Sequence, residues 1–174
     1  GAEHGIKVSS FSKIIATGLR MGWVMAAPGV VSRCAAVRYD MGSSPFQGRV
    51  IAEMIRNGDM DRHIVNLRGI YQRKYERVAD ALNRYCKDYC TWSAPLGGFF
   101  LWLKLAPTLF SRDVQVAANE KGVVVGQGPQ FFADGQATNH LRLAFSYVAM
   151  EDIEEGIQKL GEAMTEVANK SAAK

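Results

Sequence analysis

The chain has 174 residues and a formal net charge of +4 at pH 7, with 48% hydrophobic and 22% charged residues. These values are ordinary for a soluble globular protein, and no apolar run approaches the roughly 20 residues that a membrane span requires. Basic residues are interspersed with acidic ones, so the sequence predicts neither a membrane protein nor a partner nucleic acid.

Cysteine usage and the N-terminus indicate the compartment. Three cysteines, without C-x-x-C spacing, predict neither a disulfide framework nor a metal site. Residues 1–5 lack the apolar core of a signal peptide. They also lack an initiator methionine, which suggests a processed or excised chain. We expect a reducing, cytoplasmic location, with an organelle as the alternative.

The first predicted strands flank a segment with the chemistry of a cofactor site. Residues 6–9 are expected to form a short strand, and the apolar run 21–27 a buried strand. Between them lie serines, a lysine and an arginine. A lysine amine can form a Schiff base with an aldehyde, and hydroxyls with an arginine fork suit a phosphate. An aldehyde and a phosphate on one small molecule describe pyridoxal 5′-phosphate.

The segment S-F-S-K-I-I-A-T-G-L-R-M-G-W, residues 10–23, carries a family resemblance. It resembles the cofactor-lysine signature of class I/II pyridoxal-phosphate aminotransferases, in the branch of aminoadipate, kynurenine and aromatic aminotransferases. The resemblance implies that Lys13 is the catalytic Schiff-base lysine. It also implies a phosphate site, formed by Ser10, Ser12 and Arg20. A lone S-x-S-K would indicate a basic loop, but the intact G-L-R-x-G-W favours the cofactor site.

Helices dominate the middle of the chain. Periodic apolar residues predict helices over residues 30–39, 47–56 and 60–88. The last is the longest periodic run, and we expect one amphipathic helix, bent or not at Gly69. His63, in its first turn, is expected to be an ordinary surface or linker-facing histidine rather than a catalytic one.

The second half alternates strands and helices. Ser111 is expected to cap a helix, and the last residues are expected to fray. The predicted elements are strands at 99–105, 123–125 and 140–146, helices at 111–122 and 151–167, and a loop at 126–138.

Residues 1–58 are therefore expected to form the end of a large cofactor-binding domain, and residues 59–174 a small C-terminal domain. The predicted fold class is α/β: the edge of the large pyridoxal-phosphate transferase domain, followed by a compact α+β domain.

Arg142 is the second candidate site residue. On an alternating strand, Leu141 and Leu143 supply the buried side and Arg142 faces the other way. The pattern alone fits a surface arginine equally well. However, N-x-L-R-L-x-F-S resembles the aminotransferase strand whose arginine binds the substrate carboxylate, and G-G-F-F-L-W-L resembles the strand beside it. The resemblance thus implies that Arg142 binds substrate.

The resemblance implies an aminotransferase that moves an amino group between an amino acid and a 2-oxo acid, usually as a homodimer. In this family, residues N-terminal to the lysine also hold the cofactor ring, and only twelve residues precede Lys13. We therefore expect the C-terminal portion of a longer enzyme, inactive by itself. Two alternatives stay open: the aminotransferase-like effector domain of a transcriptional regulator, and a related lyase that catalyses elimination or decarboxylation.

Overall fold

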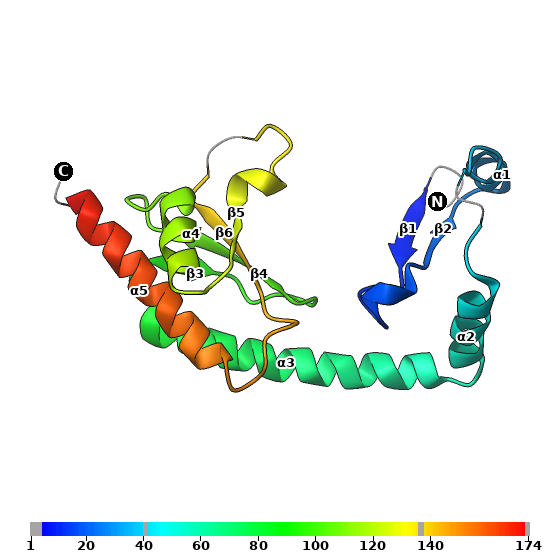
Figure 1. Ribbon diagram of the computed structural model, residues 1–174, viewed down its shortest axis with the longest axis horizontal. Helices are drawn as coiled ribbons and strands as arrows, with labels where there is room; N and C mark the ends of the chain where they lie inside the picture. The colour runs from blue at the N-terminus through cyan, green and yellow to red at the C-terminus, as the bar shows by residue number, and fades with distance from the viewer. Residues whose placement is uncertain (1–4, 40–41, 136–137, 173–174) are drawn as a thin grey trace. The chain divides into compact units, whose positions relative to one another are not determined.

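The computed structural model describes residues 5–39, 42–135 and 138–172 (Figure 1). The chain divides into two compact units, residues 1–67 and 68–174, which we call the lysine unit and the sheet unit. The elements are β1 (Lys7–Ser10), β2 (Gly22–Met25), α1 (Pro28–Ala36), α2 (Pro45–Arg56), α3 (Asp59–Tyr85), β3 (Cys90–Trp92), β4 (Phe100–Leu105), α4 (Ser111–Glu120), β5 (Gly126–Gln127), β6 (His140–Ala144) and α5 (Ile153–Ala172).

Two antiparallel strands form the sheet of the lysine unit. In the register of β1 and β2, Lys7 lies opposite Met25 and Ser10 opposite Gly22. The strand predicted at 21–27 is confirmed in position, but the expectation that it is buried is wrong. Val24 is 43% exposed and Met25 60%. An apolar strand is buried only where other elements cover it, and the described part of this unit has no third strand.

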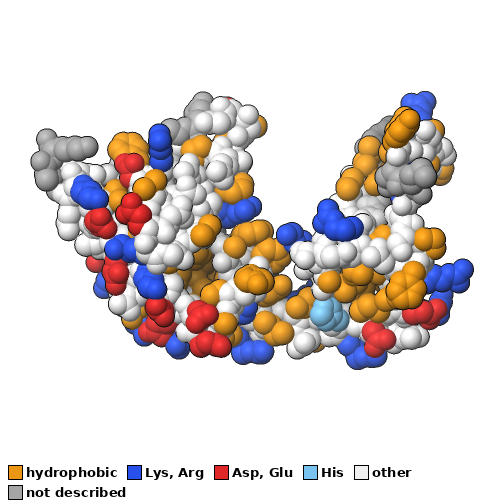
Figure 2. All heavy atoms as spheres, in the orientation of Figure 1, with side chains coloured by type: hydrophobic (Ala, Val, Ile, Leu, Met, Phe, Trp, Pro, Cys, Tyr) orange, Lys and Arg blue, Asp and Glu red, His pale blue; other side chains and the backbone are white. Residues whose placement is uncertain are grey.

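The helices of the lysine unit also leave apolar side chains exposed. No residue of α1 is buried, and α2 buries only Ile51. Figure 2 shows apolar side chains at the molecular surface. Those of this unit that are more than half exposed are Ile6, Val8, Met25, Val37, Tyr39, Phe46, Ile55 and Val65. Such an exposed apolar surface is typical of a face that another segment or subunit covers.

Helix α3 begins in the lysine unit and ends in the sheet unit. Its first turn carries Asp59 and Asp61, whose negative charges stabilise the positive end of the helix dipole. The prediction of one uninterrupted helix through Gly69 is confirmed. The helix ends at Tyr85, before residue 88, and in the turn that follows the amide of Cys90 donates to the carbonyl of Cys86 (3.0 Å).

The sheet unit contains a four-stranded antiparallel sheet in the order β3-β4-β6-β5. One face carries the alternate leucines of β4 and β6, which pack with side chains of α3, α4 and α5. The fully buried large side chains are Phe145, Leu82, Leu101, Leu103, Leu109, Leu141, Leu160, Met164, Val78, Val114 and Cys86. The mixture of helix and sheet agrees with the predicted α/β class. The domain boundary at residues 58 and 59 stays a prediction.

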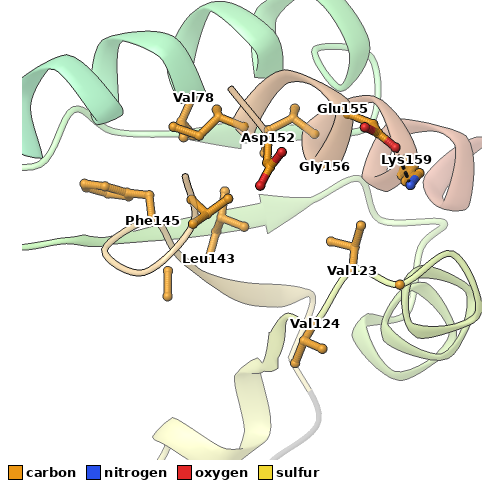
Figure 3. A pocket seen from close by; sticks show the side chains of 14 residues that line it. Val78, Val123, Val124, Leu143, Phe145, Asp152, Glu155, Gly156 and Lys159 are labelled. Atoms are coloured by element: carbon orange, nitrogen blue, oxygen red, sulfur yellow. Dashed lines mark ion pairs between the residues drawn. The ribbon is translucent and has the colours of Figure 1, made fainter. Parts of the chain in front are cut away.

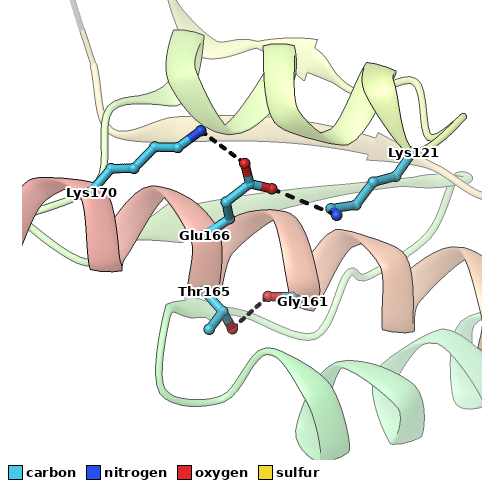
Figure 4. A network of polar contacts seen from close by, with 5 residues as sticks. All are labelled: Lys121, Gly161, Thr165, Glu166 and Lys170. Atoms are coloured by element: carbon cyan, nitrogen blue, oxygen red, sulfur yellow. Dashed lines mark hydrogen bonds and ion pairs between the residues drawn. The ribbon is translucent and has the colours of Figure 1, made fainter.

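Helix α5 continues beyond its predicted end at residue 167. Residues 168–172 were expected to fray but are helical. Polar contacts lie along its C-terminal half (Figure 4). Glu166 pairs with Lys170 (2.8 Å) and with Lys121 (3.6 Å). Thr165 donates to the carbonyl of Gly161 (2.9 Å). Solvent-exposed ion pairs contribute little net free energy, so the buried face of α5 holds it in place.

Several local features of this unit differ from the predictions, and the loop expected at 126–138 begins with strand β5. Residues 123–125 are not a strand, since the pairing with β6 begins only at Gly126. Strand β3 was not predicted, because three residues are too few for a periodic pattern. Phe110, rather than Ser111, is the N-cap of α4, and the Ser111 side chain is buried. In each case the packing against the sheet outweighs a weak local preference.

The two buried thiols predict a pH dependence of stability. Burial raises the pKa of the Cys86 thiol from 9.0 to about 12, with the charge of Cys90 adding to the shift. Burial alone raises the pKa of Cys90 from 9.0 to about 12. Both stay protonated in the fold while the unfolded chain ionises, so the free energy of unfolding should fall as pH rises from about 9 toward 12.

Urea unfolding at a series of alkaline pH values measures this fall. A Cys86→Ala, Cys90→Ala double variant should lose this component of the pH dependence. Replacing the exposed Cys34 with serine should leave it unchanged. An equal dependence in all three proteins would contradict the assignment.

Candidate functional site

The predicted cofactor lysine lies in a tight turn, residues 11–15, which we call the lysine turn. The amides of Ile14 and Ile15 both donate to the carbonyl of Phe11 (3.1 and 2.8 Å). The amide of Phe11 donates to the carbonyl of Met21 (2.9 Å), which continues the pairing of β1 with β2. Lys13 lies within this turn and is exposed. The hydrogen bonds hold its backbone while its amine is free to reach a ligand.

Arg20 has an unusual backbone conformation. It follows a 3-10 turn at Thr17–Leu19, with φ 47° and ψ 35°, in the left-handed region. It is the only non-glycine residue with positive φ in the described ranges. Such a conformation costs an ordinary side chain about 1 kcal/mol or more and tends to occur at functional sites. Arg20 is exposed, and its Nη1 lies 3.5 Å from the carbonyl oxygen of Thr17.

Gly22 permits the close approach of β1 and β2 beside Ser10. A Cβ atom at Gly22 would lie 2.9 Å from the carbonyl oxygen of Ser9. Any larger residue would therefore push the two strands apart where Ser10 enters the lysine turn. The close approach of the two strands therefore explains the second glycine of the pattern G-L-R-x-G-W.

The four predicted cofactor residues are close in the chain: Ser10 ends β1, and Ser12, Lys13 and Arg20 lie in the connection to β2. Ser12 is half-buried, and the other three are exposed. Two hydroxyls and a guanidinium are suitable donors for a phosphate, and an amine can bond an aldehyde. The donor set therefore fits pyridoxal 5′-phosphate.

His63 contacts the lysine turn, which the sequence did not predict. It is half-buried, and its Nε2 atom lies 2.8 Å from the carbonyl oxygen of Ile14. The two residues are 49 positions apart in the chain. A lone histidine in a helical pattern indicates no partner, so no signal in the sequence would have identified this contact.

Arg142 lies on the open face of the sheet, as its strand pattern predicts. Leu141 and Leu143 point into the core, whereas Arg142 is half-buried on the opposite face. Its guanidinium carbon lies 4.3 Å from the ring centroid of Phe100 and 4.1 Å from that of Phe131. Cation–π contacts with both rings favour this position of the guanidinium.

More aromatic side chains surround this arginine. Trp102 lies opposite Arg142 in the register of β4 and β6. Its ring stacks on that of His140, with the centroids 5.3 Å apart, and its centroid lies 5.8 Å from that of Phe131. Gly126 makes room for Phe131, because a Cβ atom there would lie 3.1 Å from the ring. The alternation F-L-W-L in β4 could have indicated that the aromatic residues share the face of Arg142. Phe131 lies in the segment between β5 and β6, so the strand pattern does not predict its position.

A cavity of about 350 Å³ lies elsewhere in the sheet unit (Figure 3). Leu143 and Phe145, which point away from the face of Arg142, line it together with Val123, Asp152 and the start of α5. None of the predicted site residues lines this cavity. The described residues contain no cluster of His, Cys, Asp and Glu that could hold a metal ion, and none of their helices is long and apolar enough to span a membrane.

Comparisons with known proteins place this geometry in context. The aromatic-amino-acid aminotransferase 1 of Thermococcus litoralis is 31% identical over 167 residues, which cover 95% of this chain and 40% of that protein. The HTH-type transcriptional regulator YdfD of Bacillus subtilis, itself uncharacterized, is 31% identical over 169 residues, covering 96% of this chain and 35% of that protein. The chain therefore spans well under half of these relatives.

Solved structures agree with the sequence relatives. The α-aminoadipate aminotransferase LysN from Thermus thermophilus, complexed with N-(5′-phosphopyridoxyl)-L-leucine, matches with a TM-score of 0.87 and 28% identity, over 95% of this chain and 43% of that one. The kynurenine aminotransferase of Pyrococcus horikoshii matches with a TM-score of 0.85 and 31% identity, over 92% and 40%. These names match the branch that the sequence resembles. The family model “Aminotransferase class I and II” matches residues 1–160, and the chain belongs to that family.

Proposed function

We propose that this chain is part of a pyridoxal-phosphate-dependent aminotransferase, which moves an amino group between an amino acid and a 2-oxo acid. The observation that carries this proposal is the connection between β1 and β2. Ser10 ends β1 and the connection carries Ser12, Lys13 and Arg20, in a chain of the aminotransferase family. The left-handed backbone at Arg20 supports a functional role for that connection.

Pyridoxal 5′-phosphate, when bound, would supply the aldehyde and the electron sink of the reaction. Lys13 would bond the aldehyde between turnovers. During turnover its amine, freed by the incoming amino acid, would take the proton from the substrate α-carbon as a general base. The exposed position of Lys13 on a hydrogen-bonded turn suits both roles, because the amine can move while the backbone stays in place.

The remaining residues of the proposed site bind and orient. Ser10 and Ser12 would donate hydroxyl hydrogen bonds to the cofactor phosphate, and Arg20 would pair with it through its guanidinium. Arg142 would bind the α-carboxylate of the substrate with two parallel hydrogen bonds. The contacts of the guanidinium with the rings of Phe100 and Phe131 support this role, since they favour one position of the group.

The 174 residues alone are proposed to be inactive. The chain covers 35% to 43% of the relatives above, and the lysine unit leaves many apolar side chains exposed. We propose that further protein covers these side chains and completes the cofactor site. We also propose a homodimer, in which Ser43–Phe46 face the partner, since Phe46 is 77% exposed. The free thiols fit the proposed reducing, intracellular location.

The test compares the complete gene product with the isolated 174 residues. The complete gene product, supplied with pyridoxal 5′-phosphate, is expected to transfer amino groups from an amino acid of a mixed panel to 2-oxoglutarate. It should also run as a dimer in size-exclusion chromatography with light scattering. The isolated chain should neither bind the cofactor stoichiometrically nor turn over. Stoichiometric binding by the isolated chain would contradict the proposed division of the site.

A transcriptional regulator is the second candidate function. YdfD and the regulator NorG of Staphylococcus aureus, 31% identical over 163 residues, are both named as HTH-type regulators. The upstream sequence of the gene distinguishes the two functions, because a helix-turn-helix segment there would indicate a regulator. A lyase is the third candidate. It would release ammonia or carbon dioxide from the amino-acid panel instead of forming the amino acid of the added 2-oxo acid.

A further inference from the structure

The contact between His63 and the lysine turn is a hydrogen bond of defined direction. The carbonyl of Ile14 can only accept, so Nε2 of His63 carries the proton and donates at 2.8 Å. His63 is on α3 and is half-buried. A carbonyl shielded from water costs free energy when it has no donor. The histidine therefore supplies this donor from a segment distant in sequence.

The place of this bond within the lysine turn gives it a consequence. The carbonyl of Phe11 accepts two amides and closes the turn from inside, and the amide of Phe11 links it to β2. The two bonds to the Phe11 carbonyl come from the amides of Ile14 and Ile15, which follow Lys13, so they span the lysine. The bond from His63 holds the carbonyl of Ile14, the residue directly after Lys13. In addition to the bonds within the turn and to β2, the bond from His63 thus ties the residue after Lys13 to α3.

We propose that His63 is a positioning residue, which fixes the lysine turn so that the Lys13 amine is presented to the cofactor aldehyde. The inference rests on the proposed function of Lys13. It assigns His63 no contact with substrate or cofactor and no proton transfer. Its contribution is the Nε2 hydrogen bond alone. A replacement that keeps a donor at this position should therefore behave differently from one that removes it.

Three variants of the complete gene product test the proposal. His63→Gln places an amide donor near the position of Nε2. The asparagine side chain is shorter, so His63→Asn places its donor near the position of Nδ1, too far away to reach the carbonyl of Ile14. His63→Ala removes the donor. Asn66→Ala is the matched control, since Asn66 is an exposed position of the same helix.

Two measurements separate positioning from general stability. Hydrogen exchange of the Ile14 and Ile15 amides should be about fivefold faster in the Asn and Ala variants, the effect of losing one ordinary hydrogen bond. Borohydride trapping of pyridoxal 5′-phosphate on Lys13, followed by mass spectrometry, should be slower by roughly 2- to 10-fold. The Gln variant and the Asn66→Ala control should match the unmodified protein in both. kcat should fall with KM for the amino acid unchanged.

Each other outcome counts against the proposal. Equal exchange in all variants would mean that the bond does not hold the turn. Faster exchange with unchanged trapping would mean that the bond is structural only, and a Gln variant resembling Ala would mean that the ring matters rather than the donor. If Ala unfolds, the comparison of Gln with Asn still decides. A failure to trap Lys13 in the unmodified protein would overturn the proposed function instead, while the exchange data would still report on the bond.

Discussion

Replacement of Lys13 with arginine is expected to lower kcat of the complete gene product by roughly 10³- to 10⁴-fold, near the upper limit for loss of a general base. Arginine keeps the positive charge but stays protonated, so it can neither bond an aldehyde nor accept a proton. The measurement is the single-turnover rate of the amino-acid half reaction. After borohydride reduction, mass spectrometry should find the cofactor on the peptide that contains Lys13, and on no peptide of the variant.

Lys7→Arg is the matched control for this variant. Lys7 lies on β1 in the same unit, and its amine lies 5.4 Å from the ring centroid of Trp23. It has no proposed contact with the cofactor, so kcat and labelling should be unchanged. Labelling of Lys7 in the unmodified protein, with Lys13 unlabelled, would show that the cofactor lysine is wrongly assigned.

Replacement of Arg142 with alanine is expected to lower kcat/KM for the amino acid by roughly 10²- to 10³-fold. The variant would lose the two charge-assisted hydrogen bonds proposed to the α-carboxylate, together with the guanidinium that contacts Phe100 and Phe131. Arg142→Lys should have an intermediate effect, because an ammonium keeps the charge but offers no planar fork. Steady-state kinetics over a range of amino-acid concentrations measures both variants.

The control for Arg142 is Arg112→Ala, at an exposed position of α4. It should leave kcat/KM unchanged. Trapping of the cofactor on Lys13 should also be unchanged in the Arg142 variants, since the proposed role concerns substrate alone. An Arg142→Ala protein with normal KM and impaired trapping would assign this arginine to the cofactor and contradict the proposal. Thermal unfolding of each variant checks that the substitution has not disrupted the packing of the aromatic residues around position 142.

Much of the fold follows from local patterns in the sequence. The three- and four-residue spacing of apolar residues predicts α3, because a helix must bury one continuous stripe. The alternation in β6 predicts that Leu141 and Leu143 are buried and that Arg142 is on the opposite face. The aminotransferase signature at residues 10–23 indicated the family, and the family model confirms it. The roles of its individual residues stay predictions.

Burial in the lysine unit could not be predicted in this way. The composition of residues 21–27 indicates a buried strand, yet Val24 and Met25 are exposed. Hydrophobic residues indicate that a surface would be stabilised by burial, but they do not indicate which segment covers it. Burial depends on the partner as much as on the strand itself.

The sequence by itself determined the family and the helices and strands with strong periodicity, and it predicted the roles of Lys13 and Arg142. Only the tertiary structure decided which side chains contact these residues. It brought His63 within hydrogen-bond distance of the lysine turn and placed the rings of Phe100 and Phe131 in contact with Arg142. The physical reason is range: periodicity reports on neighbours within a few residues, whereas these contacts join residues far apart in the chain.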